Sequence, residues 1–198
     1  MIGALAIPAF LRPLRRGFVL LALLVGAAFV LSSCKEKLPP CPLVRVQAPL
    51  NQITKFAPGA PMAEENVVYA SRIRGVAIKC TYAEVKARAN AKGQGASDTM
   101  EVLLKISFET LRGAAGSGSE VQAEYFVAVT DRRKAVLNRE VFQVELPLPA
   151  GRGAATTEQE AWMDFELEGR TGLAFEIYVG FQLTDEETEF NKRLLGGS

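Results

Sequence analysis

Apolar and polar residues alternate along most of the chain from residue 100 onward, which is the pattern of β-strands with one buried face. The longest run has an apolar residue at every second position from Leu173 to Leu183. Further runs share this period, with apolar members Met100, Val102, Leu104, Ile106 and Phe108, then Ala123, Tyr125, Val127 and Val129, then Phe142, Val144 and Leu146, then Met163, Phe165 and Leu167. Charged and amide residues occupy the positions between them, so we expect antiparallel strands that cover a core on one side only.

Two earlier segments also predict strands. Residues 42–46 form a short one, and Val67 to Tyr82 form a longer one that follows a Pro- and Gly-containing loop at 56–66. Gly75 marks a bulge or kink in the longer strand. Beyond it, one face carries Val76, Ile78, Cys80 and Tyr82. About seven such strands with reverse turns predict an all-β fold, an antiparallel β-sandwich of roughly immunoglobulin-like design over residues 41–184.

Residues 185–198 predict a short α-helix and tail after the sandwich. Thr184 is a good N-cap, and Glu187 three residues later completes a capping box. Acidic residues follow the cap and Lys192 and Arg193 lie near the other end, which suits the helix dipole. A helix of about ten residues does not persist alone. We therefore expect Phe190 and Leu194, which share a face, to dock on the sandwich or on a partner.

The N-terminal 33 residues have the order of an export signal: a basic flank, a short apolar run and then small residues. The apolar run from Gly17 to Leu31 spans roughly 22 Å as a helix, short of a hydrocarbon core of about 30 Å. The next residues, Leu31-Ser32-Ser33-Cys34, resemble the bacterial lipobox. That resemblance implies a signal peptide at 1–33, lipidation of Cys34 and a lipidated tether at 34–40. The alternative is an uncleaved transmembrane anchor with an ordinary cysteine.

Two features bear on the destination and the export route. Lys35 follows the lipidated cysteine, and by resemblance to Gram-negative lipoproteins this favours the periplasmic side of the outer membrane, with the inner membrane as the alternative. Arg15 and Arg16 resemble part of a twin-arginine motif, although Leu14 and Leu20 depart from it. An ordinary basic flank for the general export route explains the same residues.

Once Cys34 is acylated, Cys41 and Cys80 remain. Because exported proteins reach an oxidising compartment, the even number of remaining cysteines predicts a disulfide between these two. The alternative is two buried free thiols. A disulfide would pin the N-terminal segment to the strand that contains Cys80.

Charge and composition narrow the chemistry. Without the signal the chain has 20 basic and 22 acidic residues, so we expect no nucleic-acid binding. The chain has no histidine, which excludes a Ser-His-Asp triad and the common His-rich zinc sites. The Gly-rich loops lack a phosphate-binding motif. We therefore expect no catalytic residues, no metal site and no cofactor. Asp164 and Glu166 are paired in sequence, but this spacing is usual on any solvated strand. For Trp162, packing in the core or at an edge is favoured over a ligand platform.

The charges are unevenly distributed between the two ends expected for the sandwich. Successive connections of an antiparallel sheet alternate between ends, so the 83–97 segment, the Asp131–Lys134 turn and the Gly169–Gly172 turn share one end. That end collects Arg88, Lys92, Arg132, Arg133, Lys134 and Arg170. The other end is expected to hold loops 113–119 and 149–160 and the acidic start of the helix. Arg132, Arg133, Lys134 and Arg170 are a candidate membrane-facing basic cluster. The alternative is a set of solubilising turn residues.

Three short segments, 41–46, 125–129 and 179–184, resemble parts of a group of small Gram-negative envelope lipoproteins. The group has no assigned activity, so the resemblance assigns no functional residues. We expect a membrane-anchored, non-enzymatic interaction module for an envelope protein. One alternative is a module that binds an envelope glycan or lipid, which predicts a concave apolar pocket. Another is a carboxylate-based enzyme, which requires an Asp/Glu pair in a cleft.

Overall fold

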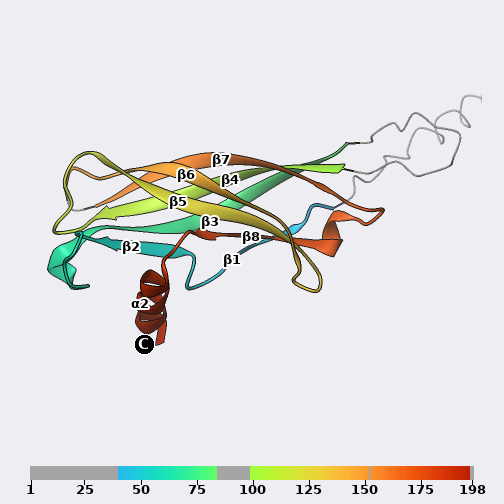
Figure 1. The fold of residues 1–198 in the computed structure, drawn as a ribbon. Coiled ribbons are helices and arrows are strands. Elements are labelled where there is room, and N and C mark those ends of the chain that lie inside the picture. Colours follow the sequence, from blue (N-terminus) through green and yellow to red (C-terminus); the bar gives the residue numbers. More distant parts are fainter. Residues whose placement is uncertain (1–39, 84–98, 152, 197–198) are drawn as a thin grey trace, which may run out of the picture. The chain divides into compact units, whose positions relative to one another are not determined.

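The computed structural model describes residues 40–83, 99–151 and 153–196. These residues form two four-stranded sheets that face each other and one C-terminal helix (Figure 1). The strand order is β1-β8-β5-β6 in the first sheet, here sheet A, and β2-β3-β4-β7 in the second, sheet B. The predicted all-β sandwich with a short C-terminal helix is confirmed.

The elements follow one another along the chain with few long connections. Sheet A contains β1 (Leu43–Val46), β5 (Glu120–Asp131), β6 (Val136–Pro147) and β8 (Phe175–Phe181). Sheet B contains β2 (Gln52–Phe56), β3 (Val67–Ala83), β4 (Thr99–Arg112) and β7 (Ala154–Glu166). Two 3-10 turns, η2 (Glu64–Asn66) and η3 (Gly172–Ala174), precede β3 and β8, and α2 (Asp185–Gly196) follows β8. The pairings are antiparallel except that β1 runs parallel to β8.

The core lies between the two sheets and is built from the alternating apolar residues of the sequence. Phe108 of β4 contacts Tyr125 of β5 and Phe181 of β8, with ring centroids 5.3 and 5.7 Å apart. Phe165 and Phe175 form a second pair across the sheets at 5.0 Å. The likeness to an immunoglobulin domain is one of architecture. The consecutive strands β2, β3 and β4 lie in one sheet here, whereas constant-type immunoglobulin domains divide their strands as ABED and CFG.

The expected bulge in β3 is present. The register between β3 and β4 shifts between Ile73 and Gly75. Ser71 and Ile73 are buried before the shift, while Val76 and Ile78 pack against the core after it, so the inward positions change from odd to even numbers. The bulge thus keeps a strand of 17 residues facing the core along its whole length.

Three segments differ from the sequence-based expectation. Gln52–Phe56 forms strand β2, although its single buried residue, Ile53, gives it no clear alternation. Residues 154–160, expected in a loop, form the beginning of β7. Their inward positions are only half-buried and hold small or polar side chains, so this part of the strand shows no apolar alternation. Leu173, expected to face inward, lies in η3 and is exposed, so the inward run begins at Phe175.

Helix α2 lies beside β2 (Figure 1). The capping box forms as predicted: the Glu187 backbone N–H donates to Thr184 Oγ1 at 3.2 Å, and the Thr184 N–H donates to Glu187 Oε2 at 2.9 Å. Phe190 docks edge-on against Phe56 of β2 at a centroid distance of 5.1 Å. Leu194, which was expected to dock together with Phe190, is exposed.

Candidate functional site at the disulfide end

The chain enters the sandwich at a point fixed by one covalent and two hydrogen bonds. Cys41 and Cys80 form the predicted disulfide, with Cα atoms 5.8 Å apart. The hydroxyl of Tyr82 donates to the Pro40 carbonyl at 2.6 Å and accepts from the Gly172 N–H at 3.0 Å. A Cβ at position 172 would lie 2.2 Å from the Pro40 oxygen, so this close approach requires glycine. We call this end of the sandwich the disulfide end.

Strand register brings the predicted connections together here. Met100 of β4 pairs with Tyr82 of β3 and with Phe165 of β7, and Asp131 of β5 pairs with Phe175 of β8. The β5–β6 turn and the connection from β7 to β8 therefore share the disulfide end, as the alternation of connections predicted. Arg88 and Lys92, assigned to the same end, lie outside the described residues, as do Cys34 and Lys35.

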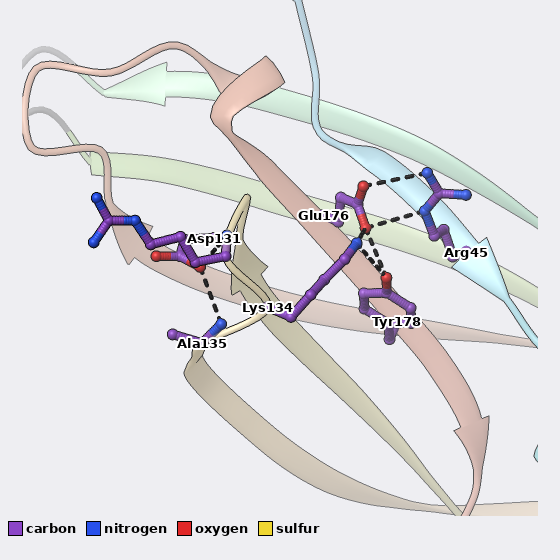
Figure 2. A network of polar contacts seen from close by, with 7 residues as sticks. Arg45, Asp131, Lys134, Ala135, Glu176 and Tyr178 are labelled. Atoms are coloured by element: carbon purple, nitrogen blue, oxygen red, sulfur yellow. Dashed lines mark hydrogen bonds and ion pairs between the residues drawn. The ribbon is translucent and has the colours of Figure 1, made fainter.

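The β5–β6 turn is closed by an aspartate. Asp131 Oδ1 accepts the backbone N–H groups of Arg133 and Ala135 at 2.8 and 3.0 Å (Figure 2). Lys134 has a φ of 66°, a left-handed conformation that a residue other than glycine adopts infrequently. The Asp131 carboxylate is therefore engaged by the backbone of its own turn.

Glu176 of β8 is the centre of a polar network on the outer face of sheet A. Its carboxylate accepts from Arg45 of β1 at 3.0 and 3.2 Å, from the Tyr178 hydroxyl at 2.7 Å and from the Lys134 ammonium (Figure 2). The hydrogen bond from Arg45, followed by those from Lys134 and Tyr178, lowers the pKa of Glu176 to about 2. Lys134 therefore lies against the outer face of sheet A. It is separated from the other three members of the basic cluster predicted from the sequence.

The other three members of the cluster meet. Arg132, Arg133 and Arg170 line one open depression of about 550 Å³, and the rest of its lining is Asp131, Thr171 and Ala174. The Arg170 guanidinium stacks over Phe175 at 4.6 Å, donates to the Leu167 carbonyl at 3.3 Å and pairs with Glu168 at 2.8 Å. Arg132 donates to the Leu173 carbonyl at 3.5 Å, which links the β5–β6 turn to η3. Two elements far apart in sequence thus share one basic hollow.

Large apolar side chains are also exposed at the disulfide end, and the alternation of the sequence did not predict them. They are Leu43, Val136, Leu137 and Leu173, and their exposed fractions range from 47% to 61%. A signal for part of this set was present, because consecutive apolar residues such as Val136 and Leu137 cannot both face the core from a strand. The exposure of Leu173 follows from η3, which breaks the alternation before β8.

A second exposed side chain, Trp162, lies on the outer face of sheet B. It is 62% exposed, which contradicts core packing as its role. Its neighbours Ala161 and Met163 are buried, so the alternation of β7 already directed Trp162 outward with Asp164. The neighbouring strand places Leu103 of β4 opposite Trp162 and Lys79 of β3 opposite Leu103.

The described part of the chain offers few groups for other chemistry. No cluster of three or more His, Cys, Asp or Glu residues there is arranged to hold a metal ion. Asp164 and Glu166 are exposed on the outer face of β7, and four open depressions each present one carboxylate: Glu124, Glu145, Glu109 and Asp131. Within the same residues, no helix is long and apolar enough to cross a bilayer.

Comparison of the chain with protein-family models, with curated proteins and with solved structures finds no match.

Proposed function

We propose that this chain is a lipoprotein anchored through Cys34 on the periplasmic side of the outer membrane, and that its sandwich is a non-enzymatic interaction module for an envelope protein. The lipobox-like Leu31–Cys34 and Lys35 support the anchor and the destination. The arrangement at the disulfide end supports presentation of the domain from the anchor. The chain that arrives from Cys34 is bonded to β3 directly after Pro40, so an anchored domain is presented from a fixed point.

Trp162 is the best candidate for contact with the partner. Tryptophan is enriched among residues that dominate protein–protein binding energy. Here it is surrounded by Leu103 on the next strand and by Glu160 and Asp164, which flank it on β7. An exposed aromatic side chain with an apolar neighbour and a charged rim has the composition of a small interface.

The partner is tested with a photo-crosslinking amino acid at position 162 of the full-length chain, in cells at native expression. We expect a discrete adduct whose mass exceeds that of the chain. Position 156 provides the matched control, because Thr156 is exposed on the same strand and the same face. Recovery of the uncrosslinked chain alone, or the same adducts from both positions, would contradict an interface at Trp162.

The anchor is tested independently with Cys34→Ala. We expect the wild-type chain to carry diacylglycerol and an acylated amine on Cys34 and the variant to be unacylated, as measured by intact mass. Fractionation of inner and outer membranes then separates the two possible destinations. A wild-type mass equal to that of an unlipidated chain would overturn the anchor.

One observation favours a glycan ligand as a second possibility. A shallow hollow beside β2 is lined by Gln122, Gln143, Gln182 and Glu124, with Ile53, Lys55 and Ala123. Amide side chains both donate and accept hydrogen bonds, which suits sugar hydroxyls. Titration of the soluble domain with peptidoglycan fragments tests this role, with Gln143→Ala expected to abolish the response and Thr156→Ala to preserve it. An absence of binding by the wild-type domain would contradict the glycan-binding role.

A further inference from the structure

We propose that the disulfide end is a membrane-contact surface, which docks on anionic phospholipid with arginines on the head-group phosphates and apolar tips in the interfacial layer. This deepens the proposed function, because the anchor places the surface at a bilayer. The contact itself depends on residues of the folded domain. It is therefore measurable without the lipid on Cys34.

The first observation is where the chain enters. Pro40 is held by Tyr82, and Cys41 is bonded to Cys80, both at the disulfide end. Cys34 and Pro40 are six positions apart, so the lipidated residue lies at most about 22 Å from this end even with the tether fully extended. Of the two ends of the sandwich, this is the one that the tether keeps close to the bilayer.

The second observation is the set of apolar side chains that the fold leaves exposed here. Across sheet A, Val136 pairs with Thr130, Thr130 with Glu176, and Glu176 with Leu43. Val136 and Leu43 therefore flank the outer face at the same level, and Leu173 projects from η3 just before β8 begins. Apolar side chains that gather on one exposed part of a protein mark an interaction surface, and the acyl boundary of a bilayer is a surface that such side chains enter favourably.

The third observation is the balance of charge. At this end, sheet A and the turns beside it carry five cationic side chains, Arg45, Arg132, Arg133, Lys134 and Arg170, and three carboxylates, Asp131, Glu168 and Glu176. Each carboxylate is engaged: Asp131 by the turn backbone, Glu168 by Arg170, and Glu176 by Arg45 and Lys134. Among the described residues, Arg132 and Arg133 have no acidic partner. This part of the end has a net charge of +2, concentrated on the two arginines at the turn tip. The outer face of sheet B near the same end carries Glu101, Asp164 and Glu166.

These three observations favour a lipid surface over a protein as the occupant. A basic hollow and separate exposed apolar side chains at one end of the domain match a head-group layer, where phosphates and acyl chains lie a few ångströms apart in depth. Each cationic side chain near an anionic surface contributes about 1 kcal/mol, or roughly a fivefold change in affinity. Arg132 and Arg133 together then account for a change of roughly 25-fold at low salt.

The experiment uses a soluble chain that begins at Lys35, because the disulfide, the core and all described strands lie within residues 40–196. Binding to phosphatidylglycerol-containing vesicles is compared with binding to phosphatidylcholine vesicles at low and high salt. We expect salt-sensitive binding to the anionic vesicles only. Arg132→Gln/Arg133→Gln is expected to weaken it roughly 25-fold, and Val136→Ser/Leu173→Ser to weaken it several-fold at either salt concentration.

Matched variants remove the same kinds of side chain elsewhere. Lys79→Gln/Lys105→Gln takes two charges from the outer face of sheet B, and Leu111→Ser removes an exposed leucine at the far end of β4. Both are expected to bind as the wild type does. Insertion is read directly with Leu173→Trp in a Trp162→Phe background, where brominated lipid is expected to quench the fluorescence of the introduced tryptophan. The same lipid is expected to leave the fluorescence of Trp162 in the unsubstituted domain unaffected.

Equal binding to both kinds of vesicle, no binding by the wild type, or equal losses from the matched variants would overturn the contact surface. These outcomes are separable from the anchor. An acylated full-length chain whose soluble domain ignores vesicles retains the proposed function and loses this surface. If the full-length chain is never acylated but its soluble domain binds vesicles, the contact surface is retained and the proposed anchor is lost.

Discussion

The junction between α2 and β2 and the disulfide end both join distant parts of the chain, but they use polar side chains differently. At the α2 junction the polar groups are turned inward. Asn191 is completely buried, and its amide donates to the Pro49 and Gln52 carbonyls at 2.9 and 2.8 Å. Glu187 is also buried, caps the helix and pairs with Lys55 at 2.5 Å.

At the disulfide end the Tyr82 hydroxyl and the Asp131 and Glu176 carboxylates are also hydrogen-bonded, but two arginines and several apolar side chains are exposed. The closure there comes from the disulfide and from Tyr82, to which Arg132 adds one long, exposed hydrogen bond to the Leu173 carbonyl. The comparison indicates which groups hold the fold and which are available to something else. At the α2 junction the polar side chains are structural, whereas at the disulfide end the exposed ones are available for external contact.

Removal of the disulfide is expected to have the largest effect on stability. In Cys41→Ser/Cys80→Ser the unfolded chain regains the freedom of a loop closed across 39 positions, which costs about 2–4 kcal/mol of unfolding free energy. Urea unfolding of the soluble chain measures this. Reductant should lower the stability of the wild type to that of the variant and leave the variant unchanged. Equal unfolding midpoints for the two proteins without reductant would show that the bond does not stabilise the fold.

The α2 junction is probed with Asn191→Ala. The substitution leaves two backbone carbonyls without their donor and opens a small cavity, so we expect a loss of about 2–3 kcal/mol. Lys192→Ala, at the next and exposed position, is expected to change stability by less than about 0.5 kcal/mol. Similar effects from the two variants would mean that the helix is not docked through Asn191, and the contrast between the two regions would fail.

The alternation of side chains predicted much of the fold, and its failures have physical causes. Strands β4 and β8 were predicted because apolar residues recur at their inward positions, interrupted in β4 by Thr110. Strand β2 was missed because it is five residues long with one buried residue, so its own residues show no alternation, and only its pairing with β3 defines it as a strand. The half-buried inward positions of the first part of β7 likewise hide its period.

The candidate site was predicted in part. The disulfide followed from the count of cysteines, and the shared end of the connections followed from antiparallel alternation. The sequence could not indicate that Lys134 folds back onto Glu176, because this depends on a left-handed turn residue and on the placement of β8 beside β5. For the same reason it could not indicate that Arg170 joins Arg132 and Arg133 in one hollow.

Two tyrosines, one with hydrogen-bond partners and one without, are expected to differ in how much their hydroxyls stabilise the fold. Tyr82→Phe removes a hydroxyl that donates to Pro40 and accepts from Gly172, so we expect a loss of about 1–2 kcal/mol in urea unfolding. The Tyr125 hydroxyl is buried and has no hydrogen-bond partner among the described residues, and burial raises the pKa of Tyr125 to about 12. Tyr125→Phe is therefore expected to be neutral or slightly stabilising. A greater loss from Tyr125→Phe than from Tyr82→Phe would contradict the assigned partners.

The smallest expected effect is the contribution of Glu176 to the loss of stability at acidic pH. Its folded pKa of about 2 lies below the usual value of 4.5, mainly because Arg45 donates to its carboxylate. A depressed pKa stabilises the folded state above the unfolded value, and this stabilisation disappears as the pH falls from about 4.5 to about 2. Glu176→Gln cannot titrate, so its unfolding free energy should fall less steeply than that of the wild type across this window, and the two curves should converge near its acidic limit. Arg45→Gln is expected to shift the titration of the Glu176 carboxyl, followed by NMR, toward its usual value. If that carboxyl already titrates near its usual value in the wild-type protein, the network does not hold Glu176 in its charged form, and Lys134 would be released to join Arg132 and Arg133.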